Sequence, residues 1–294
     1  MDSYASCSNS FSSFKECFKK DSVLSFKSAK GFFPSIYQNM VYQAKFPSRM
    51  KEKQWIFFTT AAMSTLILIQ LDTDIDKKFK PIKESNPFIE NVSPQITEIG
   101  DYYGYMLLAG FGGYSILFHN YRAFRVSLLA AQAAVTAGLW IRAGKYLSGR
   151  MRPGQSYGDA EYPNGHWFGP FGQFNAKNSL NRGVGAFDAF PSGHTGAAFS
   201  IATVFADQYH DYKAVPYVAY SLAGIVGISR LIEHEHWFSD VMVGGAIGYF
   251  CGRQVSASER KMFPDNSISK NKSHSYFYPF SMGNVNGIGW KMVF

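Results

Sequence analysis

The sequence predicts an all-α protein, a bundle of six helices that we expect to be embedded in a membrane. Six segments rich in Ala, Leu, Ile, Met and Gly are each too long for a typical strand, which favours helix. Only 17% of the 294 residues are charged, against about 25% in average soluble chains. The six segments lie at about 55–71, 102–118, 126–142, 194–209, 214–229 and 239–252.

The alternative is a soluble bundle with buried core helices. Seventeen helical residues cover roughly 25 Å, whereas the hydrocarbon core of a bilayer is about 30 Å thick. Polar residues such as Gln132 and Asp207 interrupt the segments, and the mean hydropathy is only −0.13. Composition therefore leaves the soluble bundle open.

The distribution of charge favours the membrane. Nine Lys and Arg residues precede the first segment, whereas residues 72–101, read as a loop, carry seven Asp and Glu against four Lys. Arg122 and Arg125 lie in the short loop at 119–125, and more basic residues follow the last segment. Six crossings with both termini inside agree with the tendency of positive loops to stay on the cytoplasmic side.

The chain divides into three parts. We expect residues 1–54 to form a basic leader, partly helical and lying against the rest, and residues 55–262 to form the helical domain. Residues 263–294 are a tail in which two short strands around Gly283–Gly287 predict a small β-hairpin. A long loop at 143–193 is rich in Gly and aromatic residues, which is typical of a functional or disordered loop.

A net charge of +8 suits nucleic acid, an anionic membrane surface or an anionic substrate. Nucleic acid is the weakest of the three, because the chain has no block of consecutive Lys and Arg and no nucleic-acid-binding motif. The three Cys residues are scattered and have neither metal-ligand spacing nor the pattern of a disulfide framework.

Three clusters of polar residues sit at the ends of apolar segments, and five of their residues suit an anion. Lys145, Arg152 and Arg230 are fixed positive charges, and an Arg can bind two oxygens of one oxyanion. Ser192 and Gly193 open a helix, where backbone N–H groups and the helix dipole favour negative charge. These five residues predict a site for phosphate.

The same clusters contain three residues suited to catalysis. His236 and Asp240 are four residues apart and share one helix face, so Asp240 is placed to hold the far N–H of the imidazole. The other nitrogen of His236 then becomes a nucleophile. His194 remains as a proton donor for the leaving oxygen. In the six-crossing topology, all three clusters fall on one side of the membrane, opposite the basic leader.

These residues resemble the signature of the type 2 phosphatidic acid phosphatase (PAP2) superfamily. Its three parts are Lys-x6-Arg-Pro, Pro-Ser-Gly-His and Ser-Arg-x5-His-x3-Asp, and every defining position matches in order over about residues 100–252. The matching residues are Lys145, Arg152-Pro153, Pro191-Ser192-Gly193-His194, Ser229-Arg230, His236 and Asp240.

The resemblance implies a PAP2-type helical bundle, with residues 55–262 as the phosphatase domain and without a cofactor or metal. It implies a phosphohistidine intermediate on His236, with Asp240 orienting that residue and His194 protonating the leaving group. The predicted substrate is a phosphorylated lipid or a small phosphate ester. We expect a bacterial inner-membrane protein whose active site is on the periplasmic face. No oligomeric state is predicted.

Two other functions stay open. One is a soluble, exported acid phosphatase of the same superfamily, which would be periplasmic or associated with the outer membrane. The other is a vanadate-dependent haloperoxidase, in which vanadate would occupy the same basic cradle. A metal site at Glu233-His234-Glu235-His236 is disfavoured, because neighbouring residues of that run point in different directions on a helix.

Overall fold

The structure is a computed structural model of the whole chain. It describes residue 12, residues 31–100, 102–157, 159, 161–174 and 183–262, and two strands near the C-terminal end. The helices are α3 (Phe32–Ala44), α4 (Glu52–Ser85), α5 (Pro87–Ile99), α6 (Tyr102–Leu117), α7 (Tyr121–Ser148), α8 (Pro153–Ser156), α10 (Gly193–Gln208), α11 (Ala214–Ile232) and α12 (Phe238–Met262), with 3-10 turns at Pro47–Arg49 and Val184–Phe187.

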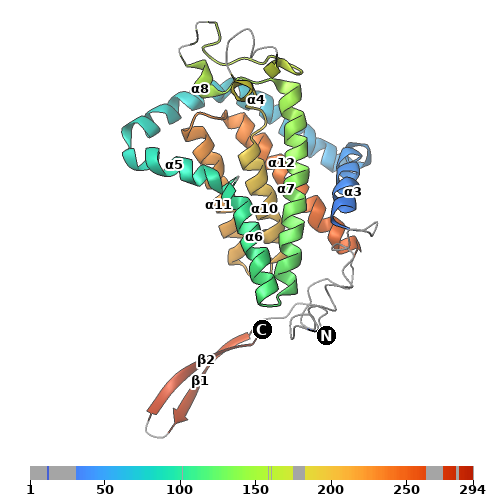
Figure 1. Cartoon of the computed structure of the whole chain (residues 1–294), viewed down its shortest axis with the longest axis vertical. Coiled ribbons are helices and arrows are strands. Elements are labelled where there is room, and N and C mark those ends of the chain that lie inside the picture. Colours follow the sequence, from blue (N-terminus) through green and yellow to red (C-terminus); the bar gives the residue numbers. More distant parts are fainter. Residues whose placement is uncertain are drawn as a thin grey trace.

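All six apolar segments form helices, namely α4, α6, α7, α10, α11 and α12, which confirms the predicted helical bundle. Helix α10 is central, because it packs against α7, α11 and α12 (Figure 1). Four of these helices meet in one apolar core in which Leu108, Val126, Leu129, Val204 and Val255 are buried. Because these four helices share one core, their positions along the bundle axis are fixed relative to one another. The core packing therefore determines which helix ends lie next to each other.

A row of glycines brings α10 and α12 into close contact. A Cβ atom on Gly248 would lie 2.1 Å from the carbonyl oxygen of Gly196, and one on Gly244 would lie 2.4 Å from that of Ser192. Small residues four apart let two helix backbones approach in this way. The contact sets the N-terminal end of α10 against the beginning of α12.

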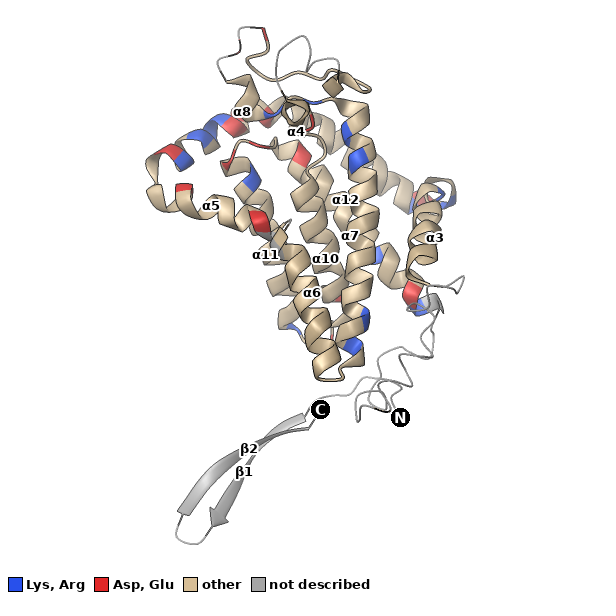
Figure 2. Ribbon diagram, in the orientation of Figure 1, with Lys and Arg blue, Asp and Glu red and all other residues tan. Residues whose placement is uncertain are grey.

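In the part of the chain that the structure describes, three helices are long and apolar enough to cross a membrane: α4, α7 and α11. Helix α6 is a shorter apolar helix. The side chains of α4 are mostly exposed, among them Phe57, Met63 and Ile67, whereas α7 lies in the interior. In Figure 2 the middle turns of α6, α10 and α11 carry no charged residue. An apolar surface of this kind suits lipid rather than water as the solvent.

Residues 72–101 are not the acidic loop that the sequence suggested. Helix α4 continues to Ser85 through Pro81, and α5 follows directly, with the Asn86 side chain accepting hydrogen bonds from the amides of Phe88 and Ile89. The helix continues because Asp72 and Asp76, four residues apart, are both buried against the bundle. Tertiary contacts thus outweigh a sequence that looks polar.

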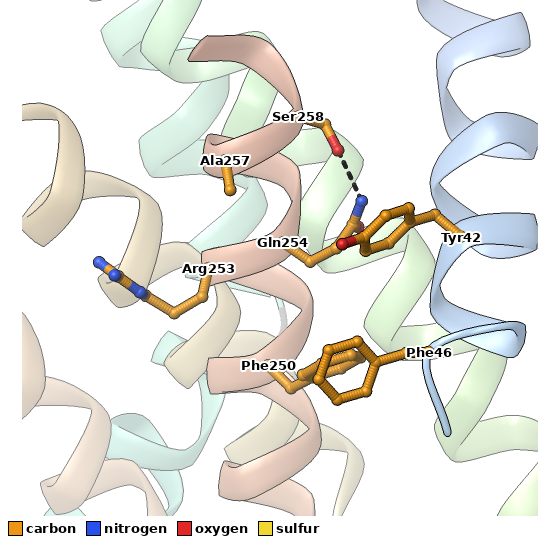
Figure 3. A pocket seen from close by; sticks show the side chains of 7 residues that line it. All are labelled: Tyr42, Phe46, Phe250, Arg253, Gln254, Ala257 and Ser258. Atoms are coloured by element: carbon orange, nitrogen blue, oxygen red, sulfur yellow. Dashed lines mark hydrogen bonds between the residues drawn. The ribbon is translucent and has the colours of Figure 1, made fainter. Parts of the chain in front are cut away.

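The leader is helical over α3, which packs against α7 and α12. Its buried face is polar: Gln43 accepts a hydrogen bond from the Trp140 indole and donates one to Gln254 at 2.7 Å. A pocket opens between α3 and α12, with Tyr42 and Phe46 on one side and Phe250 on the other (Figure 3). This pocket lies along the part of α12 that is remote from the three polar clusters.

The tail forms the predicted β-hairpin, and its strands are longer than expected. Strand β1 (His274–Met282) pairs antiparallel with β2 (Val285–Val293), from His274 opposite Val293 to Met282 opposite Val285. The hairpin is the only sheet in the described part of the chain.

Candidate active site

The three polar clusters meet at one end of the bundle. Lys145 lies in the last turn of α7, Ser192 caps the N-terminus of α10, and Arg230 lies in the last turn of α11. Arg152 precedes α8, and His236 lies in the turn between α11 and α12. The convergence that the topology predicted is therefore present.

Local sequence features shape the segments that carry these residues. Gly149 ends α7 in the left-handed region, with φ of +53°, where glycine has no Cβ to clash. Pro153 starts α8 at the first helical position, which needs no amide donor. His234 also has a positive φ, of +54°, and its carbonyl accepts a hydrogen bond from Gly154 at 2.8 Å. The turn that carries His236 is thus tied to α8.

Asp188 binds two of the predicted phosphate ligands. Its Oδ2 atom lies 3.1 Å from Nζ of Lys145, and its carbonyl oxygen accepts from the same amine at 2.6 Å. Its Oδ1 atom accepts from Nε and Nη2 of Arg152 at 3.0 and 2.7 Å. Burial raises the pKa of Asp188, but the charges of Lys145 and Arg152 outweigh it and hold the pKa below its usual range. The carboxylate is therefore ionised at neutral pH.

Glu235 joins Arg152 to Arg230. Its Oε2 atom is hydrogen-bonded to Nη1 of Arg152 and lies 3.6 Å from Nη2 of Arg230. Two carboxylates and three cations thus form one continuous network, whose formal charge is +1. Sequence reasoning missed both acids. Asp188 stands just ahead of the Pro-Ser-Gly-His cluster, and Glu235 falls among the five unspecified residues of the third cluster.

Ser192 and Gly193 begin α10 beside the same network. Ser192 is fully buried, and its amide donates to the carbonyl oxygen of Asp240 at 3.0 Å. Its hydroxyl lies 2.9 Å from that of Thr195. These bonds fix the first turn of α10, whose amides and helix dipole favour an anion. His194, in the same turn, is half-buried and packs against Gly100 at the end of α5.

His236 is 1% exposed, and its Nδ1 atom lies 2.7 Å from the carbonyl oxygen of Ala189. A carbonyl only accepts hydrogen bonds, so Nδ1 carries the proton and Nε2 carries a lone pair. The sequence predicts that Asp240 accepts this proton. In the structure the nearest oxygen of Asp240 is 3.7 Å from Nδ1, beyond hydrogen-bond distance, so the Ala189 carbonyl is the acceptor.

The surroundings of His236 keep it neutral. Burial, followed by the positive charges of Lys145, Arg152 and Arg230, lowers its pKa well below the usual 6.5. The neutral ring with a free Nε2 is the form that can attack an electrophile. Asp240, fully buried, accepts from the Trp237 amide at 2.8 Å, which fixes the start of α12.

Glu233 and His234 point away from the predicted anion site. Glu233 accepts from Lys83 of α4 at 3.0 Å. Nδ1 of His234 lies 2.8 Å from both Asp76 and the Tyr157 hydroxyl. In the described residues no group of three or more His, Cys, Asp and Glu side chains could hold a metal ion.

The arrangement as a whole suits the attack of a neutral imidazole on a bound oxyanion. Three cations and a helix N-terminus supply positive charge at one end of the bundle, and a histidine with a free nitrogen lies among them. The aromatic loop packs beside them, with Trp167 stacked over the guanidinium of Arg150 at 4.4 Å.

Comparison of the sequence with known proteins finds one matching family and two similar proteins. The model of the PAP2 superfamily matches residues 121–262, which include all three polar clusters. Lipid A 1-phosphatase of Porphyromonas gingivalis is 33% identical over 116 residues, which are 39% of this chain and 20% of that protein. Acid phosphatase of Zymomonas mobilis is 37% identical over 62 residues, which are 21% and 22% of the two chains. The matches thus span about a fifth of either curated relative.

One solved structure shares the fold. It is a transmembrane PAP2 type phosphatidylglycerolphosphate phosphatase from Bacillus subtilis, with a TM-score of 0.50 and 21% sequence identity. The similarity covers 73% of this chain and 98% of that one, and it supports the all-helical architecture.

Proposed function

Residues 121–262 of this chain belong to the PAP2 superfamily, and from that membership we propose that the protein hydrolyses a phosphate monoester or pyrophosphate on a lipid. The names of the two curated relatives, lipid A 1-phosphatase and acid phosphatase, support hydrolysis of phosphoric esters. The observation that carries the proposal is the neutral His236 ring. Its Nδ1–H donates a hydrogen bond to the Ala189 carbonyl, so the lone pair is on Nε2, near three cations.

Binding of the phosphoryl group falls to the basic residues. Lys145, Arg152 and Arg230 neutralise its oxygens, and the Gly193 amide adds the dipole of α10. Ser192 contributes as the N-cap of that helix, because its own amide is already bonded to the Asp240 carbonyl. Charge spreads over the equatorial oxygens as the phosphorus becomes five-coordinate, and fixed donors stabilise that state without reorganisation.

In the first step, Nε2 of His236 attacks phosphorus, and the bond to the leaving oxygen breaks as the N–P bond forms. His194 takes up a proton as the anionic substrate binds beside it. It then gives this proton to the leaving oxygen, so that a neutral alcohol or a protonated phosphate departs. The phosphoimidazole keeps its Nδ1–H on the Ala189 carbonyl, and the nearby Asp240 carboxylate offsets the positive charge of the ring.

In the second step, water attacks the phosphohistidine. His194, now neutral, accepts a proton from the water as the O–P bond forms and the N–P bond breaks. Inorganic phosphate leaves, and both histidines return to their starting states. The two steps need no nucleophile or proton carrier other than His236, His194 and water.

The position of the site supports a lipid substrate. It is at one end of a bundle in which α7 and α11 are long and apolar enough to cross a membrane, and in that placement the cations are near the depth of lipid headgroups. The basic residues before α4 motivate placing the site on the periplasmic face of a bacterial inner membrane. We assign residues 55–262 to the phosphatase domain, preceded by the leader 1–54 and followed by the tail 263–294.

The mechanism is tested by trapping the intermediate. Wild-type protein and His236→Ala would be mixed with substrate labelled in the phosphoryl group and quenched under conditions that preserve phosphohistidine. The wild type should carry label on His236, and the variant should carry none and turn over at background rate. His210→Ala is the matched control, because His210 is an exposed histidine just beyond the C-terminal end of α10. Full activity in His236→Ala would refute the mechanism.

The second candidate function is hydrolysis of small, water-soluble phosphate esters, which the acid phosphatase relative favours. Phosphate release would be measured in detergent from matched pairs of lipid and short-chain phosphates with the same headgroup. A kcat/KM at least about tenfold higher for the lipids supports the lipid substrate. Equal or higher values for the short-chain esters would favour the second candidate.

A further inference from the structure

Arg150 is a buried cation that the proposed mechanism does not use. It lies two residues before Arg152, yet its side chain points away from Asp188 and Glu235 and into the protein. Nη1 donates to Oδ1 of Asp240 at 2.6 Å and to the Ser239 hydroxyl at 2.7 Å. Nη2 donates to Asp72 of α4 at 2.6 Å. The guanidinium therefore bridges two carboxylates, each of which is at most 2% exposed in its side chain.

The main chain of Arg150 contacts Ala189, whose carbonyl group lies beside Nδ1 of His236. Its carbonyl oxygen accepts a hydrogen bond from the amide of Ala189 at 3.0 Å. The carbonyl of Ala189 in turn accepts the Nδ1 proton of His236. Arg150 thus touches both neighbours of that nitrogen, Asp240 through its side chain and Ala189 through its backbone.

Asp72 holds the opposite side of the network. Its Oδ1 atom accepts from the amide of Ser239 at 2.9 Å, and its Oδ2 atom accepts from the Ser239 hydroxyl at 2.5 Å. Asp72 therefore fixes both Arg150 and the residue that precedes Asp240. Helix α4 lies outside residues 121–262, so this contact comes from a part of the chain that the superfamily model does not cover.

The shape of the guanidinium matters here as well as its charge. Arg150 stacks on Trp167 at 4.4 Å and lies 5.2 Å from the ring centre of Trp237. A planar fork can bond Asp240 and Asp72 from two different nitrogens while stacking on an indole, whereas the ammonium of Lys is a point charge on a flexible stem.

We infer that Arg150 is a positioning residue for His236, that it acts by fixing Asp240 and Ala189, and that Asp72 of α4 acts through Arg150. The inference rests on the proposed function. Neither residue contacts the cations of the phosphate network, so their effect falls on the geometry of attack and not on phosphate binding. A misplacement of about 1 Å in such a geometry costs roughly a hundredfold in rate.

The test compares kcat with the affinity for inorganic phosphate, the product, which binds to the same cations without bonding to His236. Arg150→Lys and Arg150→Met should lower kcat by about 10-fold and about 100-fold per folded molecule, and Asp72→Asn by about 10-fold. The inhibition constant of inorganic phosphate should stay within about threefold of wild type in all of them, because the phosphate network is intact.

The double variant Asp72→Asn/Arg150→Met separates a relay from two independent effects. If Asp72 acts through Arg150, the double variant has the kcat of Arg150→Met alone. Arg125→Met is the control, since it breaks another buried ion pair, between Arg125 and Glu259 at 2.6 Å, at the other end of α7 and α12. It should lower the melting temperature while kcat per folded molecule stays within about threefold of wild type.

Arg150→Lys keeps the charge and is the variant to measure if Arg150→Met does not fold. Wild-type kcat in Arg150→Lys, or a rise in the phosphate inhibition constant that matches the loss of kcat, would overturn the inference alone. Multiplicative effects in the double variant would overturn the role of Asp72. A wild type that carries no label on His236 and releases no phosphate would overturn the proposed function, and the inference with it.

Discussion

Nδ1 of His236 lies 2.7 Å from the carbonyl oxygen of Ala189 and 3.7 Å from the nearest carboxylate oxygen of Asp240. The acceptor of the imidazole proton is therefore a main-chain group, which no substitution of a side chain removes. We propose that Asp240 acts on the ring through its charge and through the position of the turn. In catalytic triads of the Ser-His-Asp type the carboxylate also selects the tautomer.

Asp240→Asn should consequently lose less activity than the replacement of a carboxylate that selects a tautomer. In a triad, such an Asp to Asn change costs about 10⁴ in kcat because the wrong tautomer forms. Here the Ala189 carbonyl still selects the tautomer, so we expect a loss of about 10²-fold, from the missing charge and a less fixed Arg150. Steady-state kinetics and the quenched phosphohistidine level check this. A loss of 10⁴ or more would mean that Asp240 itself holds the proton.

His194→Ala should discriminate between leaving groups. Nitrophenolate departs without a proton, whereas an alkoxide does not, so the variant should lose at least about tenfold more activity on an alkyl phosphate than on nitrophenyl phosphate. The ratio of the two kcat values measures the effect, and wild type gives the reference ratio. An equal loss on both substrates would assign His194 to phosphate binding instead.

Chelators should leave activity unchanged, and vanadate should compete with substrate. Lys145, Arg152 and Arg230 supply the positive charge that a metal ion would otherwise bring, and a divalent cation placed among them would be repelled. Rates would be measured after dialysis against EDTA, with a metal-dependent phosphatase treated in parallel. Activity that falls in EDTA and returns with one divalent ion would contradict this.

The sequence predicts the helices well, and it predicts that the signature residues lie together, because both depend on local patterns. Long apolar runs predict helix, and spaced Lys, Arg, His and Asp residues at their ends predict where the ends meet. Asp72 and Asp76 could not be predicted, since an Asp in an acidic stretch reads as a solvated charge until its partners are known. Their partners, Arg150, Ser239 and His234, lie more than seventy residues away.

The role of Asp188 and the acceptor of the His236 proton could not be predicted either, because both depend on contacts that only the fold creates. The spacing of His236 and Asp240 on one helix face predicts a contact between them, but α12 begins only at Phe238, so His236 lies in the preceding turn and faces Ala189. Asp188 has no periodic partner in the sequence. Its role follows only from the fold that brings Lys145 and Arg152 around it.

Gly248→Ala should destabilise the bundle. The added Cβ would lie 2.1 Å from the carbonyl oxygen of Gly196 and 3.0 Å from the amide of Ser200, and both are backbone atoms that move only with α10. The two helices would have to separate beneath the candidate site, so we expect a loss of about 2 kcal/mol or more in stability and a lower yield of folded protein. Melting in detergent gives the measurement.

Gly224→Ala is the matched control for Gly248→Ala. It also lies within a helix, α11, but a Cβ there would meet no atom within 4 Å. Alanine is favoured over glycine in a helix by about 0.5–1 kcal/mol, so this variant should be as stable as wild type or slightly more so. Equal stability of the two variants would show that α10 and α12 are not in close contact at Gly248.

Asp188→Asn should bind vanadate more tightly than wild type does, and its stability should fall less steeply as the pH is lowered. The carboxylate shares Lys145 and Arg152 with any bound anion, so its removal takes away a repulsion. A unit charge at about 4 Å contributes about 1 kcal/mol even in bulk water, so vanadate affinity should rise about fivefold. Because the pKa of Asp188 is below 3.8 in the folded protein, its stabilising effect is present above that pH and disappears as the pH falls below it. Asp188→Asn should therefore melt below wild type at pH 7, and the difference should shrink toward pH 3. Weaker vanadate binding by the variant would mean instead that Asp188 holds the two cations in place for the substrate.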